Sequence, residues 1–270
     1  MIESSPDAVL DDAADRLRRA ERPLFITGAG ISADSGLPTY RGIGGLYSDR
    51  QTEEGIPIEE ALSGRMLACR PEIAWRHIAR IERNCRGASP CAAHKLIAAL
   101  EAEKPGTCVL TQNIDGLHRK AGSRNLIEIH GTVYRLLCTA CDYRRDLPDY
   151  ADYDGLALPL CPQCSRPLRP DVVLFGEMLP AAALAQLAQV MDDGPDMVFS
   201  IGTTSLFPYI AHPVWWAKQN RIAAVEINPG ETGVSPLVSH RLRMGAAQAM
   251  EALWLRLRPR TGGGVFAQLS

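Results

Sequence analysis

The sequence predicts an α/β fold in which a parallel sheet has helices on both faces and a small module is inserted. Short apolar runs alternate with segments of helical periodicity along most of the chain, as in strands joined by crossover helices. The first apolar run, 23–27, leads directly into a glycine-rich turn. Two Cys-x-x-Cys pairs interrupt the alternation in the middle of the chain.

Composition restricts the functional class. With 270 residues, 46% hydrophobic and 22% charged, the chain can form one large globular domain or a domain with an insert. A net charge of −2 gives no electrostatic footprint for nucleic acid, and no apolar run approaches the roughly 20 residues that cross a membrane. The N-terminus lacks the basic and apolar regions of a signal peptide. We therefore expect a cytoplasmic protein without nucleic-acid or membrane partners.

The N-terminal region predicts a phosphate-binding turn. A helix over 7–20 precedes the strand at 23–27, and Gly28, Gly30 and Ala33 then form a G-x-G-x-x-A pattern. Such glycines let the backbone approach a phosphate, and a helix N-terminus attracts its charge. The acidic residue that should follow about 20 residues later is missing. Instead, residues 38–56 look like a long loop, which is usually functional in a compact domain.

That loop contains Arg41, which could reach a phosphate or a ribose; the alternative is a surface arginine without a role. Beyond it, apolar spacing predicts further helices and strands, and His77 and His94 are expected to pack in helices without acting chemically. The expected helices are 71–84, 90–104, 180–191, 208–219 and 245–257, and the expected strands are 107–111, 125–129, 172–175, 196–201 and 222–227.

Polar residues follow two consecutive predicted strands. Gln112, Asn113 and Asp115 come after the first, and His130 comes after the second. Because the carboxyl ends of parallel strands meet at one edge of the sheet, these side chains should lie together at a ligand site. The alternative is that Asn113 and Asp115 only cap the next helix and that His130 is an ordinary loop histidine.

The cysteines divide into two groups. The Cys138–Cys141 and Cys161–Cys164 pairs are separated by 19 residues, a spacing that fits a four-cysteine zinc ribbon. Four sulfur ligands leave zinc no open position, so the ion should be structural. Redox pairs or incidental thiols explain the repeated spacing poorly. The other four are expected to be small buried or half-buried thiols, since cytoplasmic disulfides are rare; they are Cys69, Cys85, Cys91 and Cys108.

Taken together, these motifs resemble the sirtuin family, the NAD-dependent protein lysine deacylases. The resemblance covers about residues 10–257 in family order. The matching pieces are 28–42, 111–118, 130–131, the four clustered cysteines, 170–177, 202–205 and 227–229.

The resemblance implies a fold, a cofactor and partners. NAD would be a co-substrate, and one Zn²⁺ would be structural. Acylated-lysine proteins would bind as an extended strand. The products would be the protein with deacylated lysine, nicotinamide and O-acyl-ADP-ribose. It also implies a division of the chain: a Rossmann-like NAD-binding domain of 1–37, 86–131 and 171–270, a mobile cofactor loop with the helical part of a small domain at 38–85, and a zinc-ribbon module at 132–170.

The resemblance also assigns roles to residues. His130 would be the general base that takes a ribose hydroxyl proton, with Asn113 and Asp115 around the nicotinamide ribose. The acyl-lysine strand would lie beside Val172, Val173, Leu174, Phe175, Gly176 and Glu177. The implied NAD contacts are Gly28, Ala29, Gly30, Ser32, Asp34, Tyr40, Arg41, Gln112, Asn113, Ile114, Asp115, Gly202, Thr203, Thr204, Asn228, Pro229, Gly230 and Ala247.

Departures from the family pattern bear on the acyl group. Members that prefer succinyl- or malonyl-lysine carry a Tyr-x-x-Arg pair, whose aligned positions here are Ile78 and Ile81. Tyr47 and Arg50 have the right spacing but lie in the long loop. We therefore expect neutral acyl groups, above all acetyl. Gly-Thr-Thr at 202–204 replaces the Gly-Thr-Ser of many relatives, and Cys91 replaces an Asn.

Two other functions remain open at this point. One keeps the fold but transfers ADP-ribose to protein. The other is a non-enzymatic NAD-binding or zinc-ribbon interaction module, which would require a decayed catalytic set. The presence of Asn113, Asp115 and His130 together favours deacylation.

Overall fold

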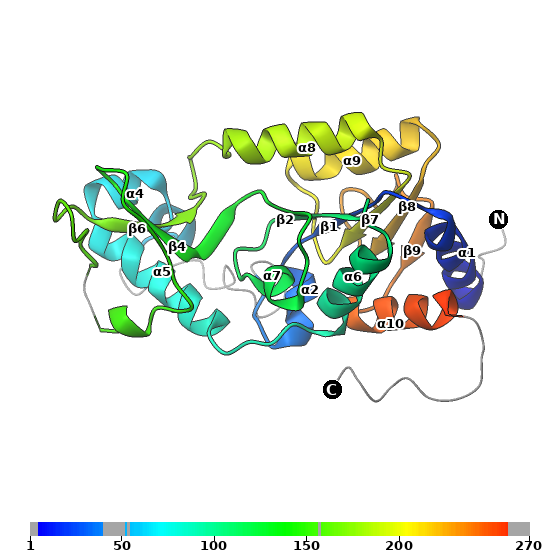
Figure 1. The fold of residues 1–270 in the computed structure, drawn as a ribbon, viewed down its shortest axis with the longest axis horizontal. Coiled ribbons are helices and arrows are strands. Elements are labelled where there is room, and N and C mark those ends of the chain that lie inside the picture. Colours follow the sequence, from blue (N-terminus) through cyan, green and yellow to red (C-terminus); the bar gives the residue numbers. More distant parts are fainter. Residues whose placement is uncertain (1–4, 40–51, 53–54, 156–157, 259–270) are drawn as a thin grey trace.

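The computed structural model describes residues 5–39, 52, 55–155 and 158–258. Two lobes lie at opposite ends of the long axis (Figure 1). The large lobe holds a six-stranded sheet and its covering helices, and the small lobe holds a three-stranded sheet and three helices. In the described part of the chain, no helix is both long enough and apolar enough to cross a membrane.

The six strands of the large sheet all run parallel, in the order β3-β2-β1-β7-β8-β9. The chain begins in the middle with β1, moves outward through β2 and β3, and returns on the other side of β1 with β7. This reversal between β1 and β7 is the switch point where open α/β sheets bind ligands. The strands are β1 (Pro23–Thr27), β2 (Cys108–Thr111), β3 (Leu126–Glu128), β7 (Met197–Ile201), β8 (Ala223–Ile227) and β9 (His240–Leu242).

Helices cover both faces of this sheet, as predicted. Strands β1, β7 and β8 are buried along their whole lengths, which is typical of parallel strands covered on two sides. Helices α8 (Ala181–Asp193) and α9 (Pro208–Gln219) pack on one face (Figure 1). The opposite face carries α1 (Pro6–Arg19), α2 (Ala29–Ser32), α6 (Ala92–Glu103) and α10 (Ala246–Leu257). A short 3-10 turn (Ala33–Ser35) follows α2, and helix α7 (Leu117–Ala121) lies between β2 and β3 in the chain.

The small lobe is formed by two separate stretches of chain around one apolar cluster. Trp75 stacks on Tyr150 with ring centroids 5.1 Å apart, and both side chains are almost fully buried. The helices are α3 (Ile58–Ala61), α4 (Gly64–Cys69) and α5 (Pro71–Cys85); the antiparallel strands are β4 (Gly131–Cys138), β5 (Arg144–Asp146) and β6 (Leu168–Val172), with a 3-10 turn at Ala151–Tyr153.

Several element predictions were wrong. Of the strand expected at 172–175, only Val172 is in a strand, as the last residue of β6. The next N–H groups bond outside the sheet, from Val173 to His130 O and from Phe175 to Leu62 O. Between the two cysteine pairs, the polar composition of 142–160 favours a loop, but the structure contains β5 and the 3-10 turn there. Helix α6 begins at Ala92 after an N-cap at Cys91, two residues later than predicted.

Candidate active site

The glycine turn after β1 packs directly against the loop after β7. The Gly28 N–H donates to Ile201 O (3.1 Å), and the Gly30 N–H donates to Gly202 O (2.8 Å). A Cβ atom on Gly30 would lie 2.6 Å from the Gly202 Cα, a separation that backbone atoms cannot accommodate without moving. The glycines are therefore needed for contact between two strand ends at the switch point.

A cavity of about 680 Å³ opens at these strand ends and extends between the two lobes. Most of the predicted NAD and substrate residues line it, including all of 172–177. The lining NAD candidates are Gly28, Ala29, Gly30, Asp34, Gln112, Asn113, Ile114, Gly202, Thr203, Thr204, Asn228 and Pro229. Four candidates are not in the lining: Ser32, Asp115, Gly230 and Ala247. Tyr40 and Arg41 lie outside the described residues.

His130 lies at the cavity wall, where β3 has ended and β4 begins. Its Nδ1 is 3.0 Å from Gln112 O, and its Nε2 is 2.7 Å from the Tyr209 hydroxyl. Because a carbonyl can only accept, we assign the proton of the neutral ring to Nδ1. Burial lowers the pKa of His130, while the bond to Gln112 O acts in the opposite direction. The ring is thus a neutral imidazole whose Nε2 lone pair is directed at the Tyr209 hydroxyl, and both residues line the cavity.

Gly131 fixes the backbone immediately after His130. It has a φ of +77°, and a Cβ there would lie 1.9 Å from Asp171 O on the neighbouring strand. Only glycine fits such a conformation and such a contact. The position of His130 is therefore fixed by the small-lobe sheet as well as by β3.

Gln112 and Asn113 connect the ends of three strands. The Gln112 side chain donates to the Thr203 hydroxyl (2.7 Å), and the backbone carbonyl of Gln112 accepts from His130 Nδ1. The Asn113 amide donates to Gly28 O (3.1 Å) and to the Ser32 hydroxyl (3.1 Å). These bonds make one rigid polar floor from the loops after β1, β2 and β7.

Asp115 lies behind this floor and does not line the cavity, and its place beside the ribose stays a prediction. Its carboxylate accepts from the Ser32 hydroxyl (2.7 Å) and from the Leu117 N–H at the start of α7 (2.9 Å). Burial raises the pKa of Asp115, although these two bonds lower it in part. The side chain therefore does cap the next helix, the alternative considered above, and it also positions Ser32 under Asn113.

Asp34 and Ala247, both expected to contact the cofactor, bond to each other. The Asp34 carboxylate accepts from the Ala247 N–H (2.9 Å) in the first turn of α10. A carboxylate is favoured there because the first N–H groups of a helix lack partners within the helix. Asp34 still lines the cavity, whereas Ala247 serves to anchor the glycine turn to α10.

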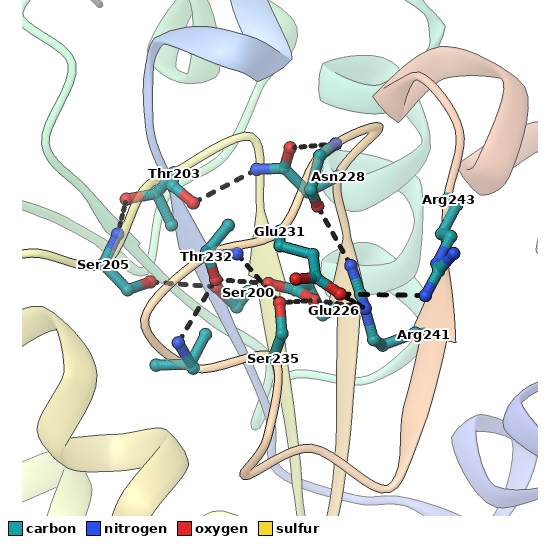
Figure 2. A network of polar contacts seen from close by, with 12 residues as sticks. Ser200, Thr203, Ser205, Glu226, Asn228, Glu231, Thr232, Ser235, Arg241 and Arg243 are labelled. Carbon is teal, nitrogen blue, oxygen red and sulfur yellow. Dashed lines mark hydrogen bonds and ion pairs between the residues drawn. The ribbon is translucent and has the colours of Figure 1, made fainter.

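The far end of the cavity wall is held by a polar network that the sequence analysis missed (Figure 2). The Asn228 side chain donates to Thr203 O (3.2 Å) and accepts from the Gly230 N–H (3.1 Å). Two residues earlier on β8, the carboxylate of Glu226 is 1% exposed and accepts from the hydroxyls of Thr232 and Ser235. Arg241 on β9 completes the network: its guanidinium lies 2.9 Å from the same carboxylate and also donates to Gly230 O.

This network fixes the loop after β8 to its own strand and to β9. A buried carboxylate is stable only when it is paired and hydrogen-bonded, and Glu226 has three such partners. The loop that carries Asn228 and Pro229 is therefore held in one position at the cavity.

The segment 172–177 forms the opposite wall and is bonded on both of its sides. The Val173 N–H donates to His130 O (2.9 Å), and the Phe175 N–H donates to Leu62 O (3.0 Å). The Leu174 N–H donates to the Glu177 carboxylate, which also forms a paired contact with Arg169 (2.6 and 2.8 Å). This segment is therefore an ordered link between the catalytic histidine candidate and the small-lobe helices.

The small-lobe end of the cavity is apolar. Ile78 and Ile81 of α5 line it, together with Leu62, Ile114 and Val133. In the described residues that line the cavity, no arginine or lysine is present. A charged acyl group placed beside these side chains would find no opposite charge among them.

The four clustered cysteines come together at the tip of the small lobe, as the spacing predicted. Their four Sγ atoms lie within 4.8 Å of one another. Two sulfur pairs, Cys138–Cys164 and Cys141–Cys161, are 3.4 and 3.6 Å apart. Tetrahedral zinc with sulfurs at about 2.3 Å requires sulfur–sulfur separations of about 3.8 Å, so a small adjustment fits the ion. The Ala140 and Gln163 N–H groups point at sulfur, as donors to thiolates would.

Aromatic residues after the second glycine loop were also missed. Phe207 and Tyr209 line the cavity beside His130, and their rings stack with centroids 5.4 Å apart. The available signal was the Phe-Pro-Tyr sequence just after the strand-end loop, with proline at the first position of α9.

The fold and the site together define an α/β protein with a dinucleotide-type cavity at the sheet's switch point and a four-thiol module beside it. Comparison with known proteins agrees with this class. The Sir2 family profile matches residues 28–207. The chain is 48% identical over 240 residues to NAD-dependent protein deacylase 2 of Pseudomonas aeruginosa, covering 88% of this chain and 93% of that protein.

Solved structures give the same result. A Sir2 homolog in complex with NAD has a TM-score of 0.80 and 33% identity, covering 91% of this chain and 93% of the other. A Sir2 protein with deacetylated p53 peptide and 3'-O-acetyl ADP-ribose has a TM-score of 0.81 and 27% identity, covering 91% and 97%. The chain belongs to the Sir2 family. The resemblance inferred from its motifs is thereby confirmed.

Proposed function

We propose that this protein is an NAD-dependent protein lysine deacylase that acts on neutral acyl groups, with acetyl-lysine as the expected substrate. One observation carries the proposal: a neutral histidine, a polar floor and an extended chain segment all face one cavity at the switch point. Relatives named as NAD-dependent protein deacylases, and the Sir2 complexes with NAD and with peptide, support the same assignment.

Residues around the switch point would hold NAD. Gly28, Gly30 and Gly202, whose turns pack on one another at the switch point, would lie against the pyrophosphate beside the start of α2, and Asn228 is fixed where the adenosine half would lie. Gln112 and Asn113 would face the nicotinamide ribose, with Asp115 supporting Asn113 through Ser32. When bound, NAD supplies the ADP-ribosyl group that receives the acyl group as nicotinamide leaves.

His130 would act as the general base in this reaction. The Nε2 atom lies at the cavity wall bonded to the Tyr209 hydroxyl, and a lowered pKa keeps the ring neutral near pH 7, so Nε2 can accept a ribose hydroxyl proton once the ribose takes the place of the phenol. Its Nδ1–H stays on Gln112 O, which stabilises the imidazolium that forms.

The acyl-lysine peptide would pair with the segment 172–177. Internal bonds already occupy the N–H groups of Val173, Leu174 and Phe175. Within the described residues, the Gly176 N–H and the Val173 carbonyl have no protein partner and remain for a peptide strand. Pairing of this kind reads the backbone of the substrate more than its side chains.

The four clustered cysteines would hold one structural Zn²⁺. Four thiolates saturate a tetrahedral ion, so the metal would stabilise the small lobe and take no part in the chemistry.

A peptide panel tests the proposal. Acetyl-, longer neutral acyl- and succinyl-lysine versions of one peptide would be incubated with and without NAD, with products identified by mass spectrometry. We expect NAD-dependent loss of neutral acyl groups and little reaction with succinyl-lysine. Equal or faster succinyl removal would contradict the acyl preference, and ADP-ribose attached to protein would indicate transferase activity instead.

Two variants test the residues to which the proposal assigns the base and the acyl preference. His130→Ala should abolish turnover while NAD binding and zinc content stay near those of the parent. The double substitution Ile78→Tyr and Ile81→Arg places a hydroxyl and a cation in the apolar end of the cavity, and should improve succinyl over acetyl removal. If His130→Ala deacetylates at the parental rate, the assignment of the base is wrong.

A further inference from the structure

His130 has a second polar partner that none of its predicted roles requires. The Tyr209 hydroxyl lies 2.7 Å from Nε2, the nitrogen that carries the lone pair. Since Nδ1 already donates to Gln112 O, the bond between Tyr209 and Nε2 must have the phenol as donor. Burial raises the pKa of Tyr209 to about 12, so the phenol keeps its proton at neutral pH.

Two aromatic contacts restrict the imidazole ring. Phe207 and Tyr209 each meet the His130 ring edge-on, with centroids 6.0 Å away and interplanar angles of 86° and 83°. The two aromatic rings stack on each other at 13°. Tyr209 is in the first turn of α9, directly after Pro208, so its backbone is also fixed. The phenol is therefore held in place independently of the histidine.

We propose that Tyr209 is a positioning residue for His130: its hydroxyl donates to Nε2 and holds the plane of the imidazole ring at the cavity wall until a ribose hydroxyl takes its place on Nε2. Without this bond, only the Nδ1 hydrogen bond to Gln112 O and the edge contacts with the two aromatic rings oppose rotation of the ring about its Cβ–Cγ bond. The phenol oxygen also has lone pairs, so it can accept from Nε2–H once the histidine has taken a proton. In kinetic terms the inference rests on the proposed deacylation.

Tyr209→Phe is the test, because it removes the hydroxyl and keeps the ring that stacks on Phe207. We expect the kcat for deacetylation to fall by roughly 2- to 10-fold, the effect of one hydrogen bond, while the KM for NAD stays the same. Exchange of labelled nicotinamide should keep its parental rate, because that step precedes the use of the base. Tyr143→Phe, which removes a hydroxyl from the cysteine module, is the matched control and should change neither rate.

A spectroscopic measurement on the protein without substrates separates this inference from the proposed function. With ¹⁵N-labelled histidine, His130 Nε2 should resonate as a hydrogen-bonded lone pair in the parent and in Tyr143→Phe, and move toward a free lone pair in Tyr209→Phe. An unmoved resonance overturns the hydrogen bond, whether or not the protein is a deacylase. A moved resonance with unchanged kcat, or equal slowing of exchange and deacetylation, overturns the positioning role.

Discussion

The substitution Gly30→Ala tests whether the contact between the loops after β1 and β7 sets the shape of the cofactor site. The added Cβ would lie 2.6 Å from the Gly202 Cα, 2.8 Å from its O and 3.0 Å from its C. Carbon atoms in contact are normally separated by roughly 3.5 Å or more, so the loops must move apart by about 0.9 Å. Gly202 cannot yield easily, because it has a φ of +59° and its N–H is bonded to Ile227 O.

Overpacking of this kind costs about 1 to 3 kcal/mol. For a chain of this size we expect Tm to fall by roughly 2 to 5 °C. Separation of the two loops should also raise the KM for NAD about tenfold or more, which corresponds to a loss of roughly 1.4 kcal/mol of binding.

The assay is thermal unfolding together with NAD titration of steady-state deacetylation. Gly233→Ala is the matched control: the nearest atom to its added Cβ is 3.7 Å away, an ordinary contact, so neither quantity should change. If Gly30→Ala keeps the parental Tm and KM, the two loops are not in the contact described, and the reasoning fails.

Three further predictions follow from the network, the buried histidines and the cysteines. Glu226→Gln should lower the free energy of unfolding by about 1.5 to 3 kcal/mol and raise the KM for NAD, because Arg241 loses its charged partner behind Asn228. The control Arg243→Gln removes an exposed 3.8 Å pair with Glu231 and should change the free energy of unfolding in urea by less than about 1 kcal/mol. Equal effects of the two substitutions would contradict the role of the network. Burial lowers the pKa of His94 to about 4 and the pKa of His118 well below its ordinary value, so below about pH 6.5 the unfolded chain binds protons that the folded protein does not. The free energy of unfolding should therefore fall as pH drops from 6.5 toward 4, by up to about 1.4 kcal/mol per pH unit for each histidine. Unfolding at pH 7, 6 and 5 should give a shallower slope for His94→Gln than for the parent, and identical slopes would refute the assignment. Cys164→Ser should lower Tm and reduce the zinc content, measured by mass spectrometry, from about one ion per chain. The control Cys69→Ser should change neither quantity. A zinc-free protein with the parental Tm would rule out the structural role.

Much of the large lobe could be predicted from the sequence because its elements are regular. Strands such as 23–27 are continuous apolar runs, and helices such as α10 have a clear apolar stripe. The polar residues after β2 and β3 were correctly placed together, since parallel strands present their carboxyl ends at one edge. The cysteine cluster followed from its spacing alone.

Elements whose form depends on distant contacts were not predictable in the same way. Strand β9 has three residues, too few for a periodic signal, and it pairs with β8 after a loop fixed by Glu226. Residues 173–175 have strand-like composition, but bonds to His130 O and Leu62 O hold them outside the sheet. Local pattern shows which side chains are apolar, and tertiary partners decide where the backbone bonds are made.

Side-chain orientation was the other limit. Sequence order placed Asp115 beside Asn113, but the turn after β2 directs one toward α7 and the other toward the cavity. Tyr209 and His130 are 79 residues apart, and only the adjacency of the loops after β3 and β7 brings them within 2.7 Å. No local pattern carries such a relation.

The order of strands in the large sheet has a consequence for how the protein is made. Strand β1 is synthesised first, yet one of its two neighbours, β7, begins only at Met197, and α1 packs against α10 at the other end of the described chain. On the ribosome, the central strand of the sheet must wait for the C-terminal third of the chain. The four clustered thiols emerge before β7 does. A metal can therefore be captured in the small lobe before the second wall of the cavity has been synthesised.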